Sequence, residues 1–149
     1  MKIALKYGLL ITLGVIAWVI VTHLLVTDPR SPVHGLGAPV FFNILEIAGI
    51  YLAINTARNE ASGELLFKSG VKTGIATALV YALTSSLFFV VMVWRVGPQL
   101  MASEPGAENL PLWKVAVVAF VGLGGGALLF GLIYSTVISF LLAKRLPRE

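Results

Sequence analysis

The chain has 149 residues, of which 58% are apolar and 12% charged, about half the charged share usual in soluble domains. Its mean hydropathy is +0.92, so lipid is the expected solvent for most of its surface. No cysteine is present, which excludes disulfides and thiolate-ligated metal centres.

Four long apolar segments follow one another along the chain. Each reaches the roughly 20 residues that a helix needs to cross a bilayer. Continuous apolar runs favour helices, because the strands of a membrane barrel would alternate in polarity. The sequence therefore predicts an all-α integral membrane bundle of four transmembrane helices that forms a single domain over residues 1–149. The predicted spans are 7–27, 36–57, 71–97 and 115–143.

Basic residues are distributed unevenly between the two sides of the predicted bundle. If both termini and the 58–70 loop lie on one side, that side holds eight of the eleven Lys and Arg residues: Lys2, Lys6, Arg58, Lys68, Lys72, Lys144, Arg145 and Arg148. Arg30, Arg95 and Lys114 remain on the other side. The positive-inside rule then predicts cytoplasmic termini in the inner (plasma) membrane. No long basic cluster is present, so nucleic acid is not an expected partner.

A sparse pattern of glycines, aromatics and charges begins at the end of the second span. Arg58-Asn59-Glu60 is followed by Gly63, Phe67, Gly70 and Gly74, and then by a long apolar segment that ends at Pro98. Together with the opening run Leu5-Lys6-Tyr7-Gly8 and a short basic tail, this pattern resembles a bacterial family of small four-helix membrane proteins, domain of unknown function 4199. The resemblance covers nearly the whole chain. It implies four spans and no established activity, substrate or catalytic residue.

Small residues recur at helical spacing in the last two predicted spans. In the third span they recur every four residues, at Gly70, Gly74, Ala78, Ala82 and Ser86. In the fourth span Gly122 and Gly126 form a GxxxG motif. Lipid provides no hydrophobic force between helices, so small residues that allow close backbone approach mark contact faces. These residues are predicted to pack helices, either within the chain's own bundle or against a second chain.

One acidic residue, Glu46, lies near the middle of the second span. On a helix it shares a face with Asn43 and Gly49. Counting from the span ends places Thr84 and Ser85 of the third span at the same depth, with Tyr81 one turn nearer the cytoplasm. The predicted intramembrane polar site is therefore Glu46, Asn43, Tyr81, Thr84 and Ser85.

No Lys, Arg or His is expected at the depth of Glu46, so its carboxyl group is predicted to be neutral. Three interpretations remain open for this residue. It is a hydrogen-bonded group that fixes helix register, a proton- or cation-coupled site, or a contact for a ligand or partner chain.

The sequence contains no recognisable catalytic arrangement. It lacks a nucleophile–base constellation, a phosphate loop and paired acid/base carboxylates. His23 and His34 have no carboxylate or thiol at a fixed spacing, so they predict no metal site. No enzyme activity, cofactor or metal is therefore expected.

These observations favour a non-catalytic integral membrane protein that works through helix association. It would act as an accessory subunit of a membrane complex or as a homo-oligomer. Its expected partners are the lipid bilayer and another membrane protein or a second copy of itself. The alternative is a small transporter or channel component that uses Glu46 as its proton- or cation-coupling group.

Overall fold

The structure is a computed structural model that describes residues 1–26, 31–97 and 110–143. The described residues form four long helices and no strand: α1 (Lys2–Leu25), α2 (Ala38–Glu60), α3 (Phe67–Val96) and α4 (Leu112–Leu142), with a π-helical turn, η1 (Val33–Gly37), leading into α2. All four helices are long and apolar enough to cross a membrane. The predicted all-α bundle of four transmembrane helices is confirmed.

The helices extend past four of the eight predicted span ends and stop one or two residues short of the other four. For example, α1 begins at Lys2 and α4 at Leu112, whereas the predicted spans begin at residues 7 and 115. Apolar composition marks only the hydrocarbon layer, and backbone hydrogen bonding continues beyond it. Three of the eight basic residues that support the predicted orientation, Lys144, Arg145 and Arg148, lie outside the described residues, as does Arg30 of the opposite side.

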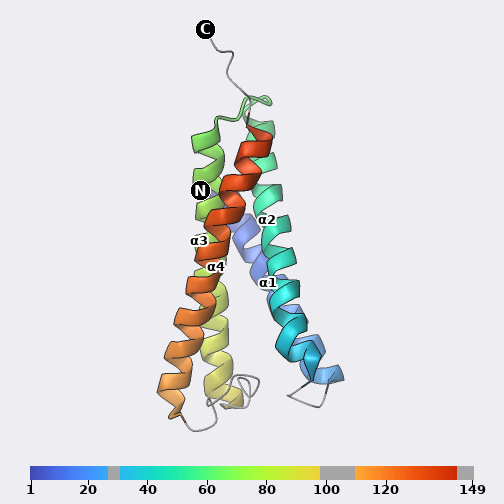
Figure 1. Ribbon diagram of the computed structural model, residues 1–149, viewed down its shortest axis with the longest axis vertical. Coiled ribbons are helices and arrows are strands. Elements are labelled where there is room, and N and C mark those ends of the chain that lie inside the picture. The colour runs from blue at the N-terminus through green and yellow to red at the C-terminus, as the bar shows by residue number, and fades with distance from the viewer. Residues whose placement is uncertain (27–30, 98–109, 144–149) are drawn as a thin grey trace.

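The helices are arranged as a bundle that is tight at one end and open at the other (Figure 1). The tight end holds Lys2 and Glu60 and is called the Lys2 end below. The opposite end holds Leu25 and Leu112 and is called the Leu112 end. α3 and α4 lie antiparallel and side by side along their length, whereas α1 and α2 diverge from them toward the Leu112 end.

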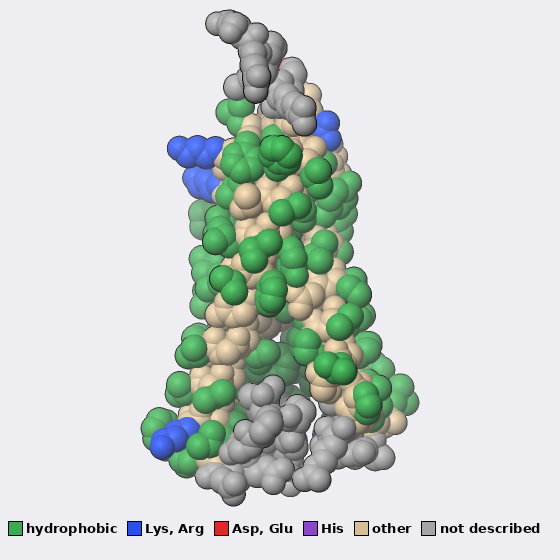
Figure 2. Space-filling model, viewed as in Figure 1, with side chains coloured by type: hydrophobic (Ala, Val, Ile, Leu, Met, Phe, Trp, Pro, Cys, Tyr) green, Lys and Arg blue, Asp and Glu red, His purple; other side chains and the backbone are tan. Residues whose placement is uncertain are grey.

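On the face shown in Figure 2, hydrophobic side chains cover the middle of the bundle, and Lys and Arg lie toward its two ends. Large apolar side chains such as Leu13, Leu87 and Leu129 are more than half exposed on three different helices. In water such a surface would drive aggregation, but in a bilayer it contacts the acyl chains. The helices therefore contact lipid directly.

The seam between α3 and α4 is built from small residues that face each other. A Cβ atom added to Gly74 would lie 2.6 Å from the Cβ of Ser135, and one added to Gly124 would lie 2.7 Å from the Oγ of Ser86. Contacts this short leave no room for a side chain, so the two backbones approach closely. The facing pairs are Gly70 with Ser139, Gly74 with Ser135, Ala78 with Gly131, and Ser86 with Gly124.

The glycines of α4 divide between two opposite faces. Gly124 and Gly131 are buried in the seam, whereas Gly122 is exposed and Gly126 is partly exposed. A Cβ atom added at Gly122 or Gly126 would meet no described atom within 4 Å. Both glycines lie two positions from Gly124, which is about 200° around a helix. The structure thus places Gly74, Ala78 and Ala82 toward the chain's own bundle, with the GxxxG motif facing away from it.

Helix α1 is held against α2 and α3 by polar and aromatic contacts. The Tyr7 hydroxyl and Thr56 Oγ1 are 2.8 Å apart, which joins the start of α1 to the end of α2. Farther along α1, Trp18 stacks on Phe41 of α2 with ring centroids 4.2 Å apart. Gly49 of α2 provides room for Ile11, because a Cβ atom there would collide with that side chain.

We expect Gly74→Ala to lower the free energy of unfolding by about 1–3 kcal/mol, because the added methyl group overpacks the seam against Ser135. The matched control is Gly125→Ala, in the middle of α4, where a Cβ atom meets open space. That change should be neutral or stabilising, since alanine favours the helix by about 0.5–1 kcal/mol. Reversible unfolding in detergent micelles measures both variants, and equal effects would contradict the close packing of the seam.

Candidate functional site

Glu46 is buried where α2 meets the seam between α3 and α4. Its side chain is 3% exposed. Its Oε1 atom lies 2.8 Å from the point where a Cβ atom of Gly131 would stand, and that Cβ atom would also collide with Ala78. The missing side chain at position 131 therefore creates a notch in the seam, and the Glu46 carboxyl group lies against this notch.

The Oε1 atom of Glu46 is shielded from the surroundings and has no hydrogen-bond partner among the residues that the structure describes. The basic residues of the described helices lie in the outer turns of those helices, far along the chain from position 46. An unpaired carboxylate in an apolar environment is very unfavourable, whereas an uncharged carboxylic acid is tolerated. The geometry therefore fits the neutral acid.

A hydrogen bond joins α4 to α2 one turn from Glu46. The Tyr134 hydroxyl donates to Oδ1 of Asn43 at 2.6 Å. The Nδ2 group of Asn43 in turn donates to the carbonyl oxygen of Pro39 at 2.8 Å. Asn43, one of the predicted site residues, thus lies one turn from Glu46, and its hydrogen bonds go to Tyr134 and Pro39 rather than to the carboxyl group.

Tyr134 was absent from the predicted site. Counting residues from the span ends places its Cα nearer the Lys2 end than Glu46. Its long side chain reaches across that difference in depth to Asn43. A search for tyrosines within reach of the predicted polar face, rather than at equal depth, would have found it.

Tyr81 lies on α3 beside the carboxyl group and is 5% exposed. Its ring packs in an apolar cluster with Ile11 and Val15 of α1. A charge on Glu46 would act electrostatically on both Tyr81 and Tyr134. One tyrosine from each of the two seam helices is therefore within electrostatic reach of the carboxyl group.

Thr84 and Ser85 lie at the predicted depth but bond elsewhere. Thr84 Oγ1 lies 2.6 Å from Thr12 Oγ1 of α1 and donates to the Val80 carbonyl oxygen at 2.7 Å. Ser85 is 3% exposed and its hydroxyl donates to the Ala82 carbonyl oxygen at 3.4 Å. Neighbouring positions on a helix lie at similar depth, but their side chains point in different directions around the helix axis. The side chain of Thr84 points toward α1.

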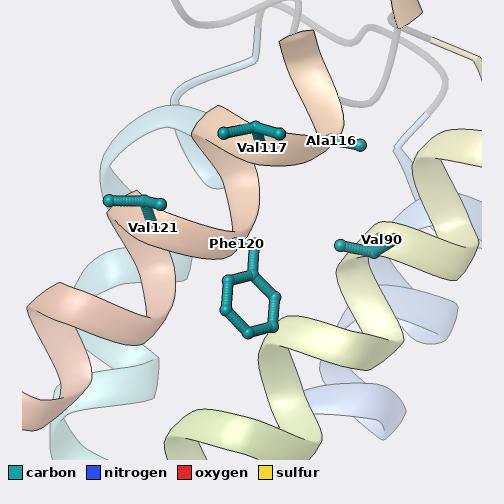
Figure 3. Close-up of a pocket in the computed structure, with 5 residues that line it drawn as sticks. All are labelled: Val90, Ala116, Val117, Phe120 and Val121. Carbon is teal, nitrogen blue, oxygen red and sulfur yellow. The ribbon is translucent and has the colours of Figure 1, made fainter. Parts of the chain in front are cut away.

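An apolar hollow lies between α3 and α4 nearer the Leu112 end (Figure 3). Its lining residues are Val90, Ala116, Val117, Phe120 and Val121, and its volume is about 230 Å³. Only hydrocarbon lines it, so it suits an acyl chain and offers no group for chemistry. Among the described residues, no three His, Asp or Glu side chains gather to hold a metal ion.

Four apolar spanning helices define the class: an integral, multi-pass membrane protein. Within that class, the chain belongs to the family described as protein of unknown function (DUF4199), with a match over residues 6–103. The resemblance predicted from the sequence is confirmed, although the matched range covers α1 to α3 and ends before α4. Comparison with the curated proteins and with the solved structures gives no match.

We expect Tyr134→Phe to lower the free energy of unfolding by about 0.5–1.5 kcal/mol, because it removes the donor to Asn43. Asn43→Ala should have a similar effect, and the double variant should lose little more than either single one. A double-mutant cycle in micelles measures this coupling. Tyr51→Phe is the control, since Tyr51 is 45% exposed on α2. Strict additivity of the two changes would show that the bond contributes nothing.

Proposed function

We propose that this protein functions by helix association, and that the Gly122–Gly126 face of α4 docks on a transmembrane helix of another chain. That chain is a subunit of a larger membrane complex or a second copy of the protein. One observation carries the proposal: both glycines lie on the outside of the bundle, with open space where their side chains would be.

Exposed glycines have no benefit for a helix that faces only lipid. Each weakens the helix by roughly 0.5–1 kcal/mol relative to alanine and contributes no apolar surface. Against a second helix the same residues allow close backbone contact, which is what stabilises association in a bilayer. The exposed side chains beside the motif provide ridges around it: Val118 (51% exposed), Val121 (64%) and Leu129 (60%).

The seam between α3 and α4 supports the proposal from within the same molecule. Gly124 and Gly131 of α4 already allow close packing against Ser86 and Ala78 of α3. The GxxxG face offers the same kind of surface on the opposite side of the same helix. α4 would then be packed between α3 and the helix of the partner chain.

The charge distribution supports an orientation with both termini in the cytoplasm, in the plasma membrane. At the Lys2 end the described basic residues are Lys2, Lys6, Arg58, Lys68 and Lys72, whereas the Leu112 end has Arg95 and Lys114. Basic loops stay in the cytoplasm. The Gly122–Gly126 face would then lie within the membrane and remain accessible only to membrane-embedded partners.

We expect the double variant Gly122→Ile/Gly126→Ile to weaken association at least about tenfold, which corresponds to about 1.4 kcal/mol. The branched side chains would keep the partner helix away from the α4 backbone. Mild solubilisation followed by mass spectrometry identifies any co-purified subunit, and single-molecule photobleaching in liposomes counts copies of the chain.

The control variant is Ala17→Ile/Ala48→Ile, which adds bulk at exposed positions of α1 and α2. A larger subunit lost only from the glycine variant would assign an accessory role, and a homo-oligomer lost only from that variant would assign self-association. A wild-type protein that remains monomeric and without partners in liposomes would contradict the proposal, as would association unchanged by the isoleucines.

A further inference from the structure

The Glu46 carboxyl group is buried among neutral groups, which suits an uncharged acid better than an anion. The hydroxyl and amide groups around it donate to other acceptors: Tyr134 to Asn43, Asn43 to Pro39, and Ser135 to Gly131. Oε1 has no partner among the described residues. Loss of the proton would leave a buried charge against the backbone notch at Gly131, which is very unfavourable.

We propose that the Glu46 carboxyl group is a proton-binding site that keeps α2 packed against the α3–α4 seam while protonated and separates them when it loses its proton to water. The bound species is a single exchangeable proton. The carboxylate that remains needs water or new donors, and α2 must move away from the notch for them to reach it.

The architecture allows α2 to move without unfolding the bundle. α3 and α4 are joined by their own seam of small residues, and α2 packs on this seam through Ile54 at Gly74 and Glu46 at Gly131. α1 and α2 already diverge from that pair toward the Leu112 end (Figure 1). Near Glu46, the hydrogen bond that links α2 to α4 is the one between Asn43 and Tyr134, and it can break without exposing a charge.

Each helix packed around the Glu46 carboxyl group contributes tyrosine, amide or apolar side chains to its surroundings. α3 contributes Tyr81 and α4 contributes Tyr134, both within electrostatic reach. α2 itself contributes the neutral Asn43. α1 packs on the neighbouring turn of α2 through Ile11, which is apolar. Glu46 is thus the acid that sets the charge of this site among the described residues.

This proton site is independent of the proposed association. Gly131, which forms the notch, lies on the seam face of α4, whereas Gly122 and Gly126 lie on the opposite face. Either proposal can therefore fail without the other, and the glycine-to-isoleucine variants leave the notch intact.

The test uses the full chain in nanodiscs, with labels introduced into its cysteine-free sequence. Spin labels at Val40→Cys on α2 and Val91→Cys on α3 occupy exposed positions (60% and 56%) and report the separation of the two helices by pulsed electron resonance. A second pair, Val91→Cys with Val117→Cys on α4, reports the seam. Mixing the labelled chains with an excess of unlabelled chains ensures that only distances within one molecule are measured. Infrared spectra of the same samples follow the C=O band of the protonated carboxylic acid.

As the pH is raised from about 5 to about 10, the infrared C=O band of the protonated carboxylic acid should disappear. This range is wide enough to include buried carboxyl groups with shifted pKa values. The distance from α2 to α3 should lengthen by several ångströms over the same pH interval, while the seam distance stays constant. Glu46→Gln, which has the same shape and cannot ionise, should keep the short distance throughout.

Three results would overturn the proposal. The first is an acid band that persists over the whole range, because the site would then exchange no proton. The second is loss of the band with no change in the distance from α2 to α3. The third is a pH-dependent distance that survives Glu46→Gln. If Glu46→Gln fails to fold, the wild-type spectra and distances still decide the matter.

Discussion

Close contact between the backbones of α3 and α4 is the constraint on which the rest of the structure depends. Glycine, alanine and serine alternate across the seam, so the two helices pack without large side chains between them. That contact fixes the rotation of α4 about its own axis. The rotation turns Gly131 toward α2, where it makes room for Glu46, and turns Gly122 and Gly126 away from the bundle.

Polar side chains in the bundle are satisfied mainly within their own helix. Several Ser and Thr hydroxyls donate to the carbonyl oxygen four residues earlier, as Thr77 and Ser135 do. Bonds between helices are few, such as Tyr7 with Thr56 and Tyr134 with Asn43. Because these hydroxyls donate to other acceptors, few donors remain for the Glu46 carboxyl group, and its Oε1 atom has no partner among the described residues.

The two proposals assign different tasks to opposite faces of α4. The inner face forms the notch that holds the Glu46 carboxyl group, and the outer face offers the glycine motif to another helix. The two faces lie on opposite sides of the helix, so each proposal can be tested without disturbing the other. The family match ends before α4, so this arrangement concerns a part of the chain that the family assignment does not describe.

The sequence by itself determined the number and the approximate positions of the membrane helices, because apolar runs of sufficient length leave no other structure for the backbone in lipid. It also placed Glu46 near the middle of the second apolar segment, far along the chain from any Lys or Arg. Tertiary structure decided which glycines pack inside, that Thr84 bonds to α1 rather than to Glu46, and that Tyr134 reaches Asn43. Depth can be counted along a chain, but the direction in which each helix face points is set by the mutual rotation of helices, and that rotation follows from contacts between residues distant in sequence.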